Sequence, residues 1–296
     1  MSIQKQIFYC WFGGDKPQKV MDCINNWKQM LPNYKIIEIN EFNKDLFDIE
    51  NECENNLWFK TCYENKMWAY VSDYARLKVL YEQGGIYLDT DITVEKDISE
   101  LLEKSKLILG WEDKKNINFA VCVVPQKNEL IKEIIDFYSK KIWKYKLFTI
   151  PQIATFVLKK QYKLNSSTEV TENDDILILP QEYFYPIPFG LKEKDGFVTE
   201  KTYTVHWWDA SWVKSNIDYF MRNKHKIKLD KLIEKCFKQK LIINTPFIKI
   251  EKLFNKYAIE IDFYWLFKFK YRYYKKKKYL TIFIFGYQIK LWEINN

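Results

Sequence analysis

The chain has 296 residues, 47% of them hydrophobic and 18% aromatic, which is enough for a sizeable core in one large domain or in a domain with an appendage. Its first residues lack the pattern of a signal peptide, and no apolar run is long enough to span a bilayer. The six cysteines have no CxxC spacing, so we exclude a disulfide-rich secreted class and expect reduced thiols in a cytoplasmic protein.

The net charge of +8 is unevenly distributed along the chain. Residues 217–296 carry 19 basic and 7 acidic side chains, a net +12, whereas residues 1–216 carry −4. This contrast predicts two domains, 1–216 and 217–296, of which the second is basic and rich in aromatic residues.

The first elements of the chain predict a βαβ unit. Residues 7–11 form a short apolar run that favours a buried strand, residues 20–30 have helical apolar spacing, and residues 34–39 favour a second strand. A strand, a helix and a strand within roughly 35 residues are typical of this unit. Neither GxGxxG nor GxxxxGK[ST] follows the first strand, which argues against a dinucleotide fold of the usual kind and against a phosphate loop.

Residues 84–91, Gly-Gly-Ile-Tyr-Leu-Asp-Thr-Asp, form the most informative stretch. They follow a predicted helix over residues 67–82, which the glycine pair ends because glycine takes the left-handed cap conformation at no steric cost. Three apolar residues then predict a short buried strand, and Asp89 and Asp91 stand at its end. Two close carboxylates repel one another unless a cation lies between them, so the pair favours a divalent metal site, with an ordinary turn as the alternative.

The later elements continue the alternation of strands and helices. We predict strands over residues 107–109, 119–124 and 176–179, and helices over 129–143 and 151–161. Such alternation favours an α/β domain with a mixed, mostly parallel sheet flanked by helices. Beyond residue 216 we predict a basic helical region, with helices over 228–240 and 249–257, and a terminal hairpin whose strands, 280–285 and 287–292, flank Gly286.

Three blocks of sequence occur in a distinctive order: Phe-Tyr-Cys-Trp-Phe-Gly-Gly at residues 8–14, Val-Ser-Asp-Tyr-Ala-Arg at 71–76, and the stretch at 84–91. Together they resemble the family 32 retaining glycosyltransferases, the DxD sugar transferases of bacterial capsule and surface-polysaccharide loci. The same blocks resemble the glucosyltransferase domains of the large clostridial toxins. The similarity covers roughly residues 3–125 and extends more loosely to 206–212. It implies a GT-A fold, a nucleotide-sugar donor and a Mn²⁺ or Mg²⁺ ion.

The resemblance also implies roles for residues on the donor side. Trp11 would stack on the base of the donor, and Asp73 and Arg76 would hydrogen-bond its ribose and sugar. Tyr87 would lie against the nucleotide, and Asp89 would contact the ribose or sugar and reach the metal. From the residues alone, a place in the core for Trp11 and a surface ion pair for Asp73 and Arg76 remain the alternatives.

A further set of residues is implied for the metal and the diphosphate. Asp91 would ligate the metal directly. His206, one of only two histidines in the chain, lies in Val-His-Trp-Trp-Asp-Ala-Ser-Trp at residues 205–212, which looks like the late His-Trp…Ser-Trp block of the family. It would be a third metal ligand, with a buried core histidine as the alternative, and Ser211 and Trp212 would hydrogen-bond the diphosphate.

The function expected from this resemblance is a metal-dependent retaining glycosyltransferase. It would move a hexose or N-acetylhexosamine from a nucleotide sugar, which we expect to be UDP-linked, to a glycan acceptor, free or lipid-linked, in capsular or surface polysaccharide synthesis. The basic region would contact the anionic inner face of the cell membrane, or pack as a solvated face on the first domain. The alternatives are a catalytically inert glycan- or nucleotide-sugar-binding protein of the same fold, and a nucleic-acid-binding protein that uses the basic aromatic region.

Overall fold

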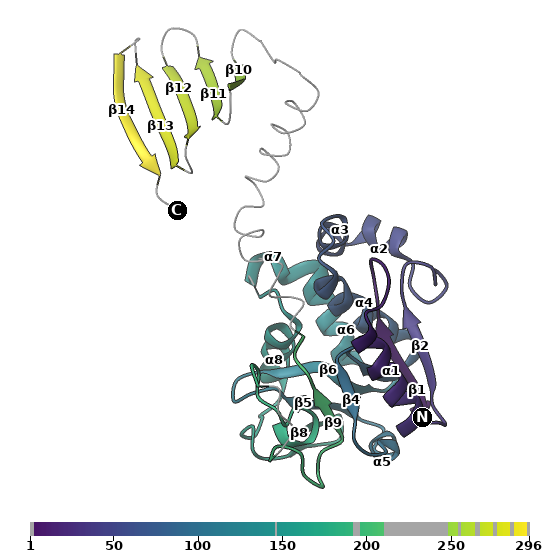
Figure 1. The fold of residues 1–296 in the computed structure, drawn as a ribbon. Helices are drawn as coiled ribbons and strands as arrows, with labels where there is room; N and C mark the ends of the chain where they lie inside the picture. Colours follow the sequence, from purple (N-terminus) through teal and green to yellow (C-terminus); the bar gives the residue numbers. More distant parts are fainter. Residues whose placement is uncertain are drawn as a thin grey trace. The chain divides into compact units, whose positions relative to one another are not determined.

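The computed structural model describes residues 3–145, 147–191 and 196–209, and the strand segments 248–253, 256–263, 267–274, 277–284 and 287–294. Contacts divide the chain into two compact units, Met1–Asn216 and Ile217–Asn296 (Figure 1). Among these described residues, no helix has both the length and the apolar character needed to cross a membrane.

The first unit is built on a seven-stranded sheet of order β2-β1-β3-β6-β5-β8-β7. Strands β2, β1, β3, β5 and β8 run parallel to one another, and β6 and β7 run in the opposite direction. The mixed, mostly parallel sheet confirms the predicted α/β class and agrees with the GT-A architecture. The strands are β1 (Gln6–Cys10), β2 (Lys35–Ile39), β3 (Gly85–Leu88), β5 (Leu107–Trp111), β6 (Ile117–Val124), β7 (Thr171–Glu172) and β8 (Ile176–Leu179).

Helices cover both faces of this sheet (Figure 1). Helices α1, α5 and α9 share one hydrophobic cluster with the sheet, while α4 packs on β1 and β3 and α8 packs on β6. The predicted helix over residues 129–143 is interrupted by a π-helical turn, Phe137–Lys141. The helices are α1 (Gln18–Met30), α2 (Ile49–Asn55), α3 (Leu57–Glu64), α4 (Trp68–Gln83), α5 (Ser99–Glu103), α6 (Glu129–Asp136), α7 (Ile142–Tyr145), α8 (Ile150–Gln161) and α9 (Gln181–Phe184).

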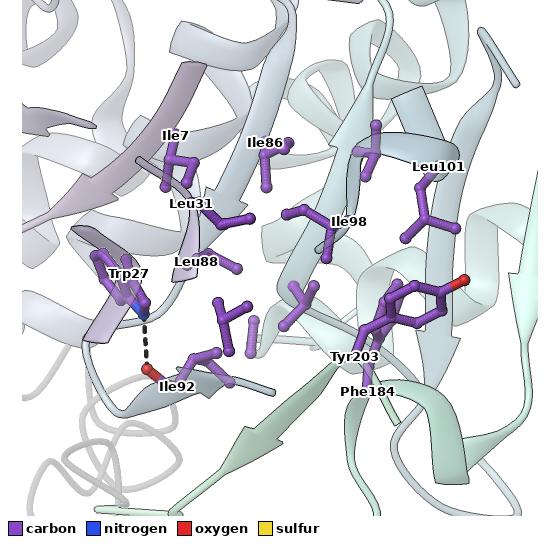
Figure 2. Close-up of a cluster of buried hydrophobic side chains, with 14 of the residues drawn as sticks. Ile7, Trp27, Leu31, Ile86, Leu88, Ile92, Ile98, Leu101, Phe184 and Tyr203 are labelled. Carbon is purple, nitrogen blue, oxygen red and sulfur yellow. Dashed lines mark hydrogen bonds between the residues drawn. The ribbon is translucent and has the colours of Figure 1, made fainter. Parts of the chain in front are cut away.

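A short second sheet lies beside the main one and was not predicted. Strand β4 (Ile92–Val94) pairs antiparallel with β9 (Thr204–His206), so that Ile92 is opposite His206. The fully buried Trp27 of α1 donates from its indole nitrogen to the carbonyl of Ile92 at 2.8 Å, as Figure 2 shows within the apolar cluster. Helix α1 therefore fixes the start of β4, and β4 fixes β9.

The glycine pair between α4 and β3 lies in a crowded place. Gly84 has φ +65° and Gly85 has φ +111°. A Cβ added at Gly85 would lie 2.9 Å from Cγ of Gln6 and 3.0 Å from its carbonyl oxygen. We expect Gly85→Ala to lower the free energy of unfolding by about 3 kcal/mol, because backbone strain and overpacking against β1 act together. Chemical denaturation followed by circular dichroism measures this loss.

Gly190→Ala is the matched control for this substitution. Gly190 has φ +92°, but among the described residues no atom lies within 4 Å of the position that a Cβ would take. Gly190→Ala therefore adds backbone strain without a collision, and it should lower the free energy of unfolding by only about 1 kcal/mol. If the two variants lose the same free energy of unfolding, the collision of a Cβ at Gly85 with Gln6 of β1 does not contribute to the loss.

The second unit is a five-stranded antiparallel sheet of order β10-β11-β12-β13-β14. The helix predicted over residues 249–257 is wrong, because β10 and β11 occupy this region, and the predicted helix over 228–240 lies outside the described residues. Large apolar residues occupy every second position over residues 257–263, Tyr-Ala-Ile-Glu-Ile-Asp-Phe, a period of two that suits a strand. The strands are β10 (Ile248–Leu253), β11 (Lys256–Phe263), β12 (Phe267–Tyr274), β13 (Lys277–Ile284) and β14 (Tyr287–Ile294).

Candidate active site

A cleft of about 790 Å³ opens at one edge of the main sheet. The carboxyl ends of β1, β3 and β5 meet there, together with the amino end of the oppositely directed β6. Ligands of open α/β sheets bind at this edge, outside the strand ends. Seven of the residues singled out in the sequence line the cleft, namely Trp11, Asp73, Arg76, Tyr87, Asp89, Asp91 and His206.

Arg76 is the centre of a buried charge cluster in the cleft. Its Nη2 lies 3.1 Å from Oδ1 of Asp73 and 3.0 Å from Oδ1 of Asp89, and only 4% of the residue is exposed. Nη1 donates to the carbonyl of Phe119 at 3.0 Å, and Nε to that of Ser72 at 3.3 Å. The guanidinium is engaged on every side and joins helix α4 to the carboxylate at the end of β3.

Two neighbours hold this cluster in place. Oδ2 of Asp73 accepts the backbone N–H of Ile150 at 3.2 Å, at the positive end of helix α8, which favours a carboxylate. The ring of Tyr87 lies 4.2 Å from the guanidinium carbon of Arg76 and is almost fully buried. Tyr87 therefore supports Arg76, and its own contact with a nucleotide stays a prediction.

Asp91 is bound from both sides by the last residue of β9 and by the segment that follows it. Its Oδ1 lies 3.2 Å from Nε2 of His206, and its Oδ2 accepts the backbone N–H of Asp209 at 2.9 Å. Its carbonyl accepts the N–H of Trp207 at 2.9 Å. The pairing of β4 with β9 thus brings together residues that are more than a hundred positions apart in the chain.

The carboxyl groups of the cleft differ in their pKa values. Burial, with help from Asp89 and against Arg76, raises the pKa of Asp73 to about 6. Burial likewise raises the pKa of Asp89, against the opposing charge of Arg76. For Asp91 burial also acts upward, but His206 and the N–H of Asp209 hold its pKa below the usual range. Asp91 is therefore ionised at neutral pH, as a metal ligand must be.

Asp89, Asp91 and His206 form a group that fits a divalent cation. One ligand atom from each can be chosen so that all lie within 4.8 Å of one another. Burial acts to lower the pKa of His206, but the nearby charge of Asp91 raises it. Nδ1 of His206 is buried and has no hydrogen-bond partner among the described residues. Two carboxylate oxygens and one imidazole nitrogen are a donor set that Mn²⁺ accepts.

The remaining residues singled out in the sequence are placed differently. Trp11 is half-buried at the end of β1, and its Nε1 donates to the carbonyl of Gly14 at 2.7 Å, which fixes the indole. Ser211 and Trp212 lie outside the described residues, so their proposed contacts with a diphosphate stay predictions.

The structure assigns further residues to the cleft. The indole of Trp208 is centred 3.9 Å from the imidazole of His206, its Nε1 donates to the carbonyl of Ile187 at 2.7 Å, and its φ of +54° is unusual for a bulky residue. Glu112, Asn118 and Asp209 also line the cleft. Trp208 and Asp209 belong to the block at residues 205–212, and Asn118 lies in a region where the sequence suggested donor or acceptor contacts. No motif marks Glu112, which reaches the cleft only through the pairing of β5 with its neighbours.

Comparison with known proteins places this cleft in context. Residues 17–108 match the family described as "Glycosyltransferase sugar-binding region containing DXD motif". The chain is 29% identical over 160 residues to lactosylceramide 4-alpha-galactosyltransferase of Pongo pygmaeus, covering 50% of this chain and 70% of that one. It is 25% identical over 260 residues to subversion of eukaryotic traffic protein A of Legionella pneumophila, covering 72% of this chain and 39% of that one.

Most of these relatives are longer proteins. The chain spans less than half the length of the other curated relatives that it matches, 43% for the human galactosyltransferase and 42% for the rat enzyme. Among solved structures, PaToxG glycosyltransferase aligns with a TM-score of 0.44 and 16% identity, covering 54% of this chain and 69% of that one. The region that matches the family description, residues 17–108, contains Asp73, Arg76, Asp89 and Asp91.

Proposed function

We propose that the chain is a metal-dependent retaining glycosyltransferase, because residues 17–108 match the family described as "Glycosyltransferase sugar-binding region containing DXD motif". Its donor is a UDP-linked hexose or N-acetylhexosamine, and its acceptor is a hydroxyl group of a glycan. The observation that carries the proposal is the convergence of Asp89, Asp91 and His206 beside the Arg76 cluster in one cleft.

Each cleft residue has a defined task in this proposal. Trp11 stacks on the base, and the cluster of Asp73, Arg76 and Asp89 binds the ribose and sugar hydroxyl groups. Asp89, Asp91 and His206 hold Mn²⁺ or Mg²⁺, which, when bound, stabilises the negative charge that develops on the leaving diphosphate.

The transfer itself exchanges one bond for another at the anomeric carbon. The bond from this carbon to the phosphate oxygen breaks as the acceptor oxygen attacks the same face, and the departing phosphate takes the acceptor proton. Asp89 and Asp91 stand one residue apart on one strand end, so they are not placed to flank a sugar from opposite sides as the carboxylates of a hydrolase do. A covalent sugar trapped on a protein carboxylate during turnover would contradict this mechanism.

Titration calorimetry with UDP-galactose, UDP-glucose and UDP-N-acetylglucosamine, with and without Mn²⁺, tests the proposal. We expect one of them to bind only with Mn²⁺ and then to be hydrolysed slowly without acceptor. Binding without hydrolysis would instead support the catalytically inert relative of the same fold. Absence of binding to every nucleotide sugar, together with binding to RNA or DNA, would support the nucleic-acid alternative.

Trp11 should contribute to the binding of the donor and not to the transfer step. Stacking of an aromatic side chain on a base contributes about 1–3 kcal/mol. We expect Trp11→Ala to raise the KM for the donor about tenfold or more with little change in kcat, and Trp11→Phe to restore most of the affinity. Tyr145→Ala is the control, because Tyr145 is an exposed aromatic residue that does not line this cleft. An unchanged KM in Trp11→Ala would remove Trp11 from the donor site.

The cellular role remains part of the proposal. We propose a cytoplasmic enzyme of capsular or surface polysaccharide synthesis, with a lipid-linked acceptor, whose basic residues 217–296 contact the anionic inner face of the membrane. The net charge of +12 in these residues supports the membrane contact.

A further inference from the structure

Glu112 is a carboxylate of the cleft that the proposed donor chemistry does not use. It follows β5, is half-buried, and lines the same cleft as Asp89 and His206. Its Oε2 accepts a hydrogen bond from Nδ2 of Asn118 at 3.0 Å. Its Oε1 has neither a hydrogen-bond nor an ion-pair partner within the part of the chain that the structure describes.

The position of Glu112 is fixed relative to the donor cluster. Oδ1 of Asn118 accepts the backbone N–H groups of Phe119 and Ala120, at 2.6 Å and 2.9 Å, so its Nδ2 is directed to Glu112. The carbonyl of Phe119 accepts Nη1 of Arg76, and the carbonyl of Ala120 accepts the N–H of Asp89, at 2.8 Å. Three consecutive residues of β6 thus connect Glu112 to Arg76 and to Asp89.

The order of the strands shows on which side of the donor Glu112 lies. Along the sheet the order is β1, β3, β6 and β5. Trp11 follows β1, the proposed metal ligands Asp89 and Asp91 follow β3, and Glu112 follows β5. A donor whose base lies at Trp11 and whose diphosphate lies at Asp91 directs its sugar toward β6 and β5. Glu112 is then at the far end of the cleft, beyond the diphosphate.

We propose that Glu112 binds a hydroxyl group of the acceptor sugar through Oε1, and so helps to determine which acceptor is used. The inference rests on the proposed function and adds to it a residue of the acceptor subsite. A carboxylate that is held in place through one oxygen and has its other oxygen free in a cleft is suited to a ligand with hydroxyl groups. Burial and the charge of Asp113 raise the pKa of Glu112 to about 7, so near neutral pH it both accepts and donates hydrogen bonds.

Glu112→Gln tests this role with little disturbance of the fold. Glutamine has the same size, and its amide oxygen can still accept the hydrogen bond of Asn118. Glu129→Gln is the matched control, because 80% of that side chain is exposed and it does not line the cleft. The affinity for the nucleotide sugars is measured by calorimetry in Mn²⁺. The binding of lactose and of methyl β-galactoside and β-glucoside to protein saturated with UDP and Mn²⁺ is measured by saturation-transfer NMR.

We expect Glu112→Gln to weaken the binding of the sugar that wild type prefers by about tenfold or more, while the affinity for the donor stays within about twofold. An equal loss of donor affinity would place Glu112 in the donor subsite and overturn the proposal. Unchanged sugar binding in the variant, or wild type that binds none of these sugars, would overturn it as well. A failure of the proposed function itself gives a different result: the wild-type protein would then bind no nucleotide sugar in the presence of Mn²⁺.

Discussion

Asp91→Asn is expected to abolish the Mn²⁺-dependent binding of a nucleotide sugar and to lower kcat/KM for donor hydrolysis about a thousandfold. Of the carboxyl groups in the cleft whose pKa is shifted, Asp91 is the one whose pKa is lowered, so it carries the negative charge that a divalent cation needs. An amide at this position leaves Asp89 and His206 as the remaining protein ligands, with one charge fewer. Calorimetry with and without Mn²⁺, together with hydrolysis rates, measures the loss.

This substitution separates chemistry from folding. The amide oxygen of asparagine can still accept the backbone N–H of Asp209, so the metal-free variant should still fold cooperatively, with a loss of stability from the weakened pairing with His206. Asp45→Asn is the control, because it removes an exposed carboxylate before α2 and should change neither measurement. Full Mn²⁺-dependent donor binding by Asp91→Asn would show that the cation lies elsewhere and would refute the proposed site.

The sequence predicted the part of the site that lies on continuous elements. The blocks between residues 8 and 91 placed Trp11 and Asp89 at strand ends and Arg76 on the helix before β3, as in the structure, because a helix, a glycine pair and a buried strand each leave a local pattern. The i, i+3 spacing of Asp73 and Arg76 in α4 predicted a shared helix face, and the two side chains form an ion pair.

The remaining part of the site depends on the pairing of strands that are far apart in the sequence, which the sequence alone does not show. The strands β4 and β9 have three residues each, too few to show a period, yet their register sets His206 beside Asp91. Glu112 and Asn118 enter the cleft because β6 runs antiparallel between β3 and β5, a topology that the alternation of elements did not specify. In the second unit a helix was predicted over residues 249–257, although the following segments, Lys256–Phe263 and Phe267–Tyr274, alternate with a period of two.

Arg76→Met is expected to lower the free energy of unfolding by about 4 kcal/mol, the largest stability loss predicted for this chain. The substitution keeps much of the apolar stem but leaves Asp73 and Asp89 buried without their counter-charge, and it frees the carbonyl groups of Ser72 and Phe119. Chemical denaturation of the metal-free protein, followed by tryptophan fluorescence, measures the loss.

Glu82→Gln on the same helix is the matched control. Glu82 pairs with Lys127, and about half of each side chain is exposed, so removal of this charge should cost about 1 kcal/mol or less. Losses of similar size in the two variants would show that the Arg76 cluster does not stabilise the fold. Adding Asp73→Asn to Arg76→Met should recover part of the loss, since one unpaired charge is then removed.

The stability loss in Arg76→Met should also depend on pH in a defined direction. The pKa of Asp73 is already raised to about 6 in the folded protein, and removal of the guanidinium raises it further. A carboxyl whose pKa is higher in the folded than in the unfolded state binds its proton more tightly when folded, so the free energy of unfolding rises as the pH falls. The loss should therefore be largest near pH 8 and shrink as the pH falls through 6. A loss that grows on acidification would mean that Asp73 stays ionised through another partner, and that Arg76 is not the group that neutralises it.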